Sequence, residues 1–205
     1  YKGEPKIKRI EMEILPPSQQ VAAIKSGKYD LVFMASTDIF PEIEKFDNIN
    51  IATRKANYMN YIAFKLGKWD AEKNENIVNP NAKMYDINLR KAIAYAIDND
   101  AIGEQFFHGL ASTAKSQLSP SFPSLHNSDI NGYRIDIEKA KKLLDDAGYK
   151  DVDGDGIREG KDGKPIKFTF AMMSGGETAE PISQYYLQQW KSIGLNVELV
   201  DGRLL

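Results

Sequence analysis

The chain has 205 residues, of which 42% are hydrophobic, so it can bury a core as one large domain or two small ones. Its 27 basic and 29 acidic residues give a formal net charge of −2, which argues against nucleic acid or an anionic membrane as a partner. Cysteine is absent, so structural disulfides and thiolate metal sites are excluded. No run of residues approaches the roughly 18 apolar positions that a membrane-spanning helix needs.

The N-terminal part of the chain predicts a β-α-β unit. Residues 6–15 alternate charged and apolar side chains, which is the period of a half-buried strand. Pro16, Pro17 and Ser18 then favour the start of a helix that ends at Gly27, and residues 30–34 read as a short buried strand. The simplest arrangement is a right-handed crossover onto one sheet. Three further elements follow: a short amphipathic helix at 39–46 and strands at 49–54 and 57–66.

The rest of the chain alternates helical and extended patterns. The polar stretch 68–84 predicts an exposed loop, and the serine-rich stretch 116–128 predicts irregular structure. Asp86 is a candidate cap for a helix, and Gly148 is a candidate C-terminal stop for another. We expect helices at 87–97, 100–107, 136–147 and 180–193, the last between strands at 167–173 and 196–200. The order predicts an α/β fold with a twisted mixed sheet flanked by helices, and leaves open two sheets joined through the 50s.

Four segments, in this order, resemble family 5 of the bacterial solute-binding proteins, which serve ABC peptide importers. They are 26–31 (SGKYDL), 85–98 (YDINLRKAIAYAID), 140–149 (AKKLLDDAGY, followed by DGDGIR at 153–158) and 188–198 (QQWKSIGLNVE). One such segment would be weak evidence, because each also makes a sensible helix or turn. Four such segments at family-like spacing are specific evidence. The resemblance extends over nearly the whole chain.

The resemblance implies the lobe fold of a type II periplasmic-binding-protein-like receptor, whose two lobes close on the ligand. Residues 1–54 would belong to a partial first lobe. Residues 55–205 would form an incomplete second lobe that carries one wall of a peptide cleft. Both ends of the sequence are expected to continue into a longer protein.

The same resemblance implies a function outside the cytoplasm. We expect a monomer that binds oligopeptides and delivers them to an ABC permease in the membrane, either as a cell-surface lipoprotein or in the periplasm. No nucleic acid and no catalysis are expected. The alternative from another class is a calcium-stabilised surface or adhesion module.

Recognition of an extended peptide through its main chain calls for polar residues along a strand edge and in loops that approach the ligand. Tyr58 and Asn60 are two apart, so a strand would place them on one face, where the family places residues that line the ligand. A second candidate is Ser119, which follows a predicted helix. A third is the loop after the strand at 167–173, at the edge where open α/β folds hold ligands. Its candidate residues are Ser174, Gly175 and Gly176.

An acidic loop carries the sharpest chemical pattern. Oxygen ligands at positions one, three and five, a backbone carbonyl at seven and a carboxylate at twelve match a calcium loop, and Gly156 at position six allows the turn. The alternative is a turn in which the aspartates bind backbone amides. A bound calcium would be structural, and no cofactor is required. The candidate ligands are Asp151, Asp153, Asp155, Ile157, Glu159 and Asp162.

No pattern of residues supports an enzyme. His108 and His126 are the two histidines, and neither has a second metal-ligating partner at suitable spacing. No serine lies in a nucleophile elbow, and no glycine-rich phosphate loop follows a predicted strand. The sequence therefore favours a binding protein without catalytic residues.

Overall fold

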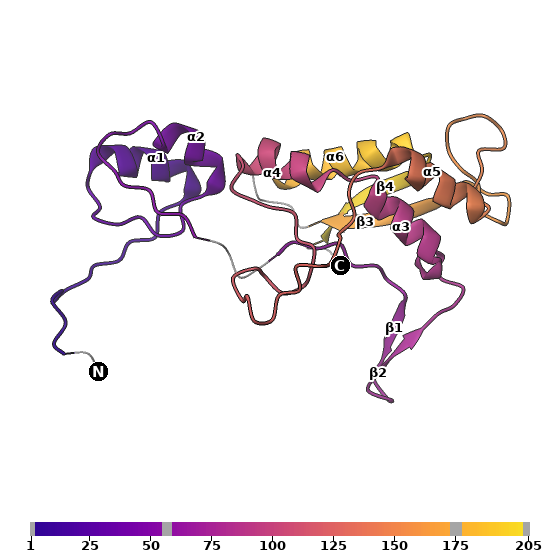
Figure 1. The fold of residues 1–205 in the computed structure, drawn as a ribbon, viewed down its shortest axis with the longest axis horizontal. Coiled ribbons are helices and arrows are strands. Elements are labelled where there is room, and N and C mark those ends of the chain that lie inside the picture. The colour runs from indigo at the N-terminus through magenta and orange to yellow at the C-terminus, as the bar shows by residue number, and fades with distance from the viewer. Residues whose placement is uncertain (1–2, 55–58, 173–177, 203–205) are drawn as a thin grey trace. The chain divides into compact units, whose positions relative to one another are not determined.

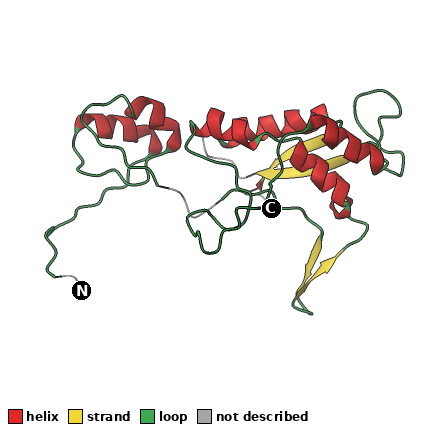
Figure 2. Ribbon diagram, in the orientation of Figure 1, coloured by secondary structure: helices red, strands yellow, loops and turns green. Residues whose placement is uncertain are grey.

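The computed structural model describes residues 3–54, 59–172 and 178–202. It divides into two compact units, Tyr1–Thr53 (unit 1) and Arg54–Leu205 (unit 2), which are described separately below. Figure 2 shows that the regular structure of unit 1 is helical, whereas unit 2 contains helices and strands. In the described part of the chain, no helix combines the length and apolar character needed to span a bilayer.

Unit 1 contains two helices around a small core. The predicted helix before Gly27 is confirmed, with a proline at its first position and Gly27 in the left-handed conformation (φ 65°) that ends it. Ile24, Ile39 and Ile43 are buried against one another. The elements are α1 (Pro17–Ser26), the 3₁₀ turn η1 (Thr37–Ile39) and α2 (Phe40–Ile43), the last two lying where one amphipathic helix was expected.

The predicted strands of unit 1 are wrong. Residues 6–15, 30–34 and 49–54 contain no strand, so the expected β-α-β unit does not form. The alternating pattern describes which side chains could be buried, but a strand also needs a partner for its backbone, and no strand lies beside these segments in the described residues. Most of their apolar side chains are consequently exposed, as for Met12 (93%) and Ile14 (97%).

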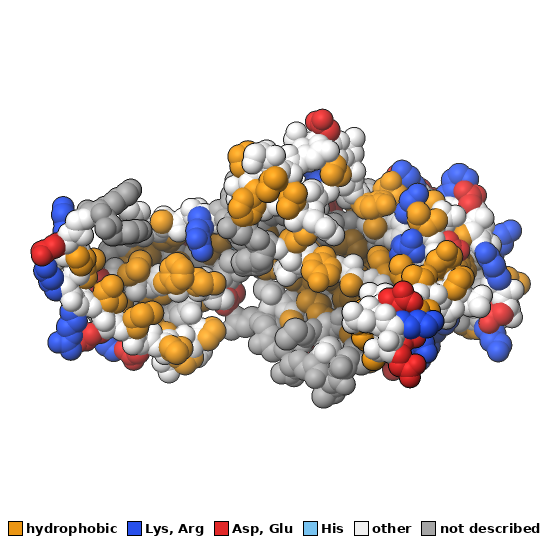
Figure 3. Space-filling view, turned by 90° about the horizontal axis from the view of Figure 1, so that it is seen from below, with side chains coloured by type: hydrophobic (Ala, Val, Ile, Leu, Met, Phe, Trp, Pro, Cys, Tyr) orange, Lys and Arg blue, Asp and Glu red, His pale blue; other side chains and the backbone are white. Residues whose placement is uncertain are grey.

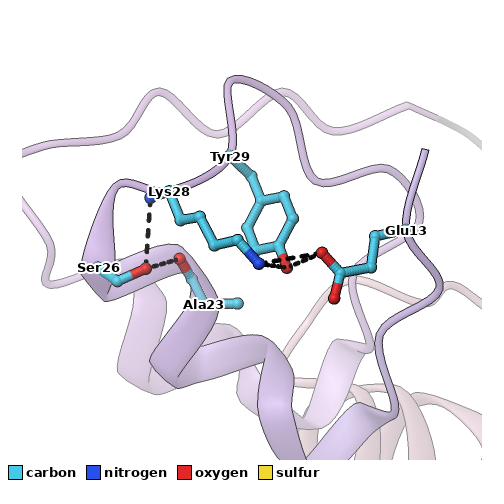
Figure 4. A network of polar contacts seen from close by, with 5 residues as sticks. All are labelled: Glu13, Ala23, Ser26, Lys28 and Tyr29. Atoms are coloured by element: carbon cyan, nitrogen blue, oxygen red, sulfur yellow. Dashed lines mark hydrogen bonds and ion pairs between the residues drawn. The ribbon is translucent and has the colours of Figure 1, made fainter. Parts of the chain in front are cut away.

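A polar network joins the 6–15 segment to the turn after α1 (Figure 4). The Tyr29 hydroxyl donates to Glu13 Oε2 at 2.6 Å, and Lys28 Nζ lies 3.0 Å from the same oxygen. The hydrogen bond from Tyr29, and then the Lys28 ammonium, lower the pKa of the Glu13 carboxyl. The Ser26 hydroxyl accepts from the Lys28 amide at 3.3 Å and so fixes the turn.

Unit 2 confirms the predicted helices and its two long strands. Three of these helices start where an aspartate was available as a cap: the carboxylates of Asp86, Asp98 and Asp136 accept from backbone amides in the first turn of α3, α4 and α5. Residues 116–128 are irregular, as predicted. The elements are β1 (Gly67–Asp70), β2 (Glu75–Val78), η2 (Lys83–Tyr85), α3 (Ile87–Tyr95), α4 (Asn99–Phe107), α5 (Ile137–Asp146), β3 (Lys167–Met172), α6 (Ala179–Ser192) and β4 (Asn196–Asp201).

The β3 and β4 strands are parallel neighbours joined by α6, which gives unit 2 its α/β character (Figure 1). Their register runs from the pair Lys167 and Asn196 to the pair Met172 and Asp201. Exposure alternates along β3, and its inward residues Phe168 and Phe170 pack against Trp190 of α6.

A second layer of the core joins α3 to α5. Leu89, Ala92, Ala140 and Leu144 are each fully buried, and small alanines on both helices allow the close approach. The core is a continuous cluster that includes Trp190, whose indole nitrogen donates to the Ile93 carbonyl at 3.3 Å. Unit 2 therefore has a core of its own.

The 68–84 region was wrongly predicted as a loop. It contains β1 and β2, which form an antiparallel hairpin whose turn places Asn74 at φ 53° and uses the Asp70 carboxylate to accept from two turn amides. Both faces of the hairpin are largely exposed, and its side chains show little alternation between polar and apolar positions. The predicted strand at 57–66 is not found either: its described residues 59–66 are irregular.

Candidate functional site

The predicted ligand-binding residues divide into described and undescribed ones. Tyr58, Ser174, Gly175 and Gly176 lie outside the described residues. Asn60 is exposed and Ser119 is half-buried, both in unit 2.

The segment 59–66 alternates between the core and solvent although it is not in a sheet. Ile62 and Phe64 pack against the core of unit 2, whereas Tyr61 is 79% exposed. Asn60, two residues before the partly buried Ile62, is exposed. Between described residues, the segment 59–65 makes no backbone-to-backbone hydrogen bond, and whether its amides and carbonyls pair with an extended partner stays a prediction.

Ser119 shapes an irregular loop. Its hydroxyl accepts from the Ser121 amide at 3.2 Å, and its carbonyl accepts from the Phe122 amide at 3.0 Å. His126 Nδ1 lies 2.7 Å from the neighbouring Leu118 carbonyl, which holds the far side of the loop. These contacts are typical of a serine that stabilises a turn, and the ligand role of Ser119 stays a prediction.

The carboxyl edge of β3 and β4 is the other region where a ligand was expected. The parallel register brings Met172 and Asp201 together at this edge. Ser183, 2% exposed, donates to the Ala179 carbonyl at 2.7 Å and lies 2.8 Å from Met172 Sδ, so α6 is fixed against the end of β3. This geometry positions the start of the loop that carries the glycine candidates.

Three tyrosines of unit 2 have a raised pKa: the buried Tyr149 and the half-buried Tyr185 and Tyr186. Burial, and then Asp86, raise the pKa of Tyr149 to about 12, and its hydroxyl donates to Asp86 Oδ2 at 3.1 Å. Burial also raises the pKa of Tyr185 and Tyr186. The Tyr185 hydroxyl accepts from the Asp98 amide at 3.2 Å and joins α6 to the start of α4. Each of these contacts connects elements of the core.

The acidic loop lies between α5 and β3. Carboxylate oxygens of Asp151, Asp153 and Glu159 lie within 4.8 Å of one another, a group that the other predicted ligands do not join. Asp155 accepts from the Ile157 amide at 2.7 Å, and Asp162 accepts from the Lys164 amide at 3.2 Å. The structure therefore combines the two interpretations of the sequence. The carboxylates of the loop accept from backbone amides, and three of them also converge.

An arginine that the sequence analysis had not singled out, Arg158, connects this loop to the ends of α5 and α6. Arg158, next to Glu159, pairs with Asp145 at the end of α5 at 2.5 Å. Its Nε donates to the Ile193 carbonyl at 2.9 Å, and its side chain packs where a Cβ on Gly194 would come within 2.8 Å. Only its place inside the DGDGIR segment, just after the glycines, could have indicated this role.

Three comparisons relate the chain to known proteins. The model of the family 5 bacterial extracellular solute-binding proteins, middle region, matches residues 1–202. Oligopeptide-binding protein OppA of Lactococcus lactis subsp. lactis is 34% identical over 207 residues, which cover 100% of this chain and 34% of the relative. Oligopeptide-binding protein AppA of Bacillus subtilis is 31% identical over 202 residues, covering 97% of this chain and 34% of the relative.

Solved structures agree with this similarity. Lactococcal OppA, complexed with an endogenous peptide in its closed conformation, matches with a TM-score of 0.81 and 34% identity over 92% of this chain and 35% of that chain. AppA of Bacillus subtilis in complex with a nonapeptide matches with a TM-score of 0.65 and 25% identity over 92% of this chain and 35% of that chain. The chain thus spans about a third of the length of the relatives it matches.

Proposed function

The chain belongs to the family 5 bacterial extracellular solute-binding proteins, and from this premise we propose that it binds oligopeptides outside the cytoplasm and delivers them to an ABC permease. The observation that carries the proposal is its similarity, over its whole length, to oligopeptide-binding proteins of two organisms. The type II binding-protein fold of those relatives is the fold of this chain.

The peptide is favoured over other cargoes by the order of the similarities. Heme-binding protein A of Haemophilus influenzae is 29% identical over 73% of the chain, and the nickel-binding periplasmic protein of Escherichia coli is 24% identical. Both values are below those of the OppA proteins.

The physical basis of binding is main-chain recognition. Among the described residues, the backbone groups of 59–65 have no backbone partners, and the segment includes the exposed Asn60 and Tyr61. An extended peptide that pairs with such a segment gains hydrogen bonds whatever its sequence, and an aromatic side chain supplies apolar contact. No covalent step is required, and the protein acts as a monomer whose two lobes, with residues 1–54 in the first and 55–205 in the second, close on the ligand.

The test is calorimetric titration of the full-length protein with a mixed pool of short peptides. We expect Asn60→Ala to weaken binding about threefold to tenfold, because one hydrogen bond contributes about 0.5–1.5 kcal/mol. Asn76→Ala on the exposed strand β2 is the matched control and should leave the affinity unchanged. Equal affinities of both variants and the unsubstituted protein would remove the Asn60 side chain from the binding surface.

The cell-surface location can be tested separately. The proposal places the protein outside the cytoplasm, as a lipoprotein or in the periplasm. Labelling of intact cells or spheroplasts with a membrane-impermeant lysine reagent should modify the protein, whereas a cytoplasmic marker stays unlabelled. Protection of the protein to the same degree as the marker would contradict the location.

A further inference from the structure

Three carboxylates converge in the acidic loop without a cationic side chain to balance them. Oxygens of Asp151, Asp153 and Glu159 lie within 4.8 Å of one another. In the described part of the chain, no lysine or arginine forms an ion pair with any of the three. Negative charges at this separation repel one another, so the arrangement is stabilised by a cation placed among them.

The buried member of the group gives independent evidence for a ligand. Glu159 is only 6% exposed. Its Oε2 accepts from the Val152 amide at 2.7 Å, whereas its Oε1 is buried and has no hydrogen-bond partner. A buried carboxylate oxygen that has lost water and gained no partner is costly, and such an atom is rare in native structures unless an ion or water completes it.

The backbone holds this carboxylate in place. The Glu159 amide donates to the Lys150 carbonyl at 2.9 Å, which closes the loop at its base, and Glu159 also bridges to Pro165. The Asp151 carboxylate accepts from the Gly154 and Gly156 amides at 2.8 and 3.0 Å. Both glycines have φ above 80°, a conformation that suits residues without a Cβ. The converging oxygens are thus part of an ordered turn.

We propose that this loop binds a single Ca²⁺ through the carboxylates of Asp151, Asp153 and Glu159. Only oxygen donors are present, which favours a hard cation, and a flexible set of carboxylates completed by water suits Ca²⁺ better than the strict octahedron of Mg²⁺. Glu159 takes the place that the sequence pattern gave to Asp162, whose carboxylate accepts from the Lys164 amide. The site is separate from the peptide surface, and its role is structural.

Binding should stabilise the connection between α5 and β3. Because residues 151–156, which include two of the three ligands, are exposed, we expect an affinity in the range of extracellular calcium modules, with a Kd of about 10⁻⁴ to 10⁻³ M. Calcium at about 10 mM should then raise the Tm by roughly 5 °C, as mass action on the folded state requires.

The experiment is a thermal-unfolding titration of the metal-free protein with CaCl₂, with MgCl₂ in parallel, together with calorimetry. Asp153→Asn removes one exposed carboxylate with little structural risk, and Glu159→Gln removes the buried one. Both should weaken calcium binding at least tenfold, which at about 10 mM calcium should cut the rise in Tm to about half or less. Asp162→Asn and Asp155→Asn are the matched controls and should keep the full rise.

Three outcomes would overturn the proposal. The first is that calcium gives neither a heat of binding in calorimetry nor a rise in Tm. The second is a rise in Tm for Asp153→Asn that is as large as for the unsubstituted protein. The third is a shift lost in Asp162→Asn but kept in Glu159→Gln, which would place the metal where the twelve-residue pattern put it. Peptide affinity measured in the same samples distinguishes failure of this site from failure of the proposed function, because the two are independent.

Discussion

The two units of the chain differ in how much of their apolar surface they bury. Unit 2 has five large side chains with less than 2% exposure: Trp190, Leu89, Leu144, Ile193 and Leu195. Unit 1 buries three isoleucines, packs a few partly buried apolar side chains against them and leaves many others in solvent, as Ile14 and Phe33 show at 97% and 71% exposure. Figure 3 shows one face of the molecule, where hydrophobic side chains are visible over both units.

This difference shows which elements a local sequence signal can specify and which depend on distant residues. Helix caps act within a few residues, so α1 in unit 1 and α3 in unit 2 both form as expected. A strand depends on a partner that can be far away in sequence. β3 has β4 beside it, whereas residues 6–15 have no neighbouring strand in the described structure and stay irregular.

The largest effect is expected for the core of unit 2. Trp190 is 1% exposed and packs against Phe170 and Tyr186, so Trp190→Ala should cost about 3–5 kcal/mol of unfolding free energy. The measurement is urea unfolding followed by far-ultraviolet circular dichroism. Trp69→Ala on the exposed hairpin is the control and should cost less than about 1 kcal/mol. Equal costs for the two variants would mean that unit 2 is not organised around this core.

A smaller effect compares one glycine from each unit. Gly27 and Gly194 both have positive φ, and a Cβ costs about 1–2 kcal/mol in that conformation. Around Gly27 the space is open, whereas at Gly194 a Cβ would come within 2.8 Å of the Arg158 side chain. Gly194→Ala should therefore lower the melting temperature more than Gly27→Ala. The reverse order would show that Arg158 moves freely and does not tie the acidic loop to α6.

The smallest of these effects depends on pH. Folding raises the pKa of Tyr149 from its ordinary value of 10 to about 12, so the stabilisation is complete below pH 10 and is lost as the pH rises from 10 to about 12. Tyr149→Phe should lower stability by about 1 kcal/mol at pH 8, through the lost bond to Asp86, and the gap from the unsubstituted protein should close above pH 11. A gap that stays constant with pH would contradict this. Melting temperatures across the pH range provide the measurement.

Much of the fold could be predicted from the sequence, and the failures have physical causes. The helices of unit 2 were predictable because Asp86 and Asp136 cap periodic apolar patterns. The β1–β2 hairpin was missed because neither face is buried, which leaves no alternation to detect. The bond between Asp86 and Tyr149 joins residues 63 apart, and no local pattern indicates it.

The candidate sites divide in the same way. The acidic loop was visible in the sequence because its aspartates and glycines follow one another at fixed spacing. That Glu159 is buried with a free oxygen depends on its pairing with Lys150 and Pro165, which only the fold supplies. The peptide surface depends on backbone groups, which every residue carries, so Asn60 and Ser119 were candidates through the family resemblance and stay predictions.

Native mass spectrometry of the full-length protein, mixed with equal amounts of short peptides, nickel and haem, tests the oligopeptide function most directly. We expect a folded monomer that carries one peptide per molecule, with masses spread over many sequences, because recognition runs through the peptide main chain. A protein that takes up nickel or haem and leaves the peptides in solution would contradict the account.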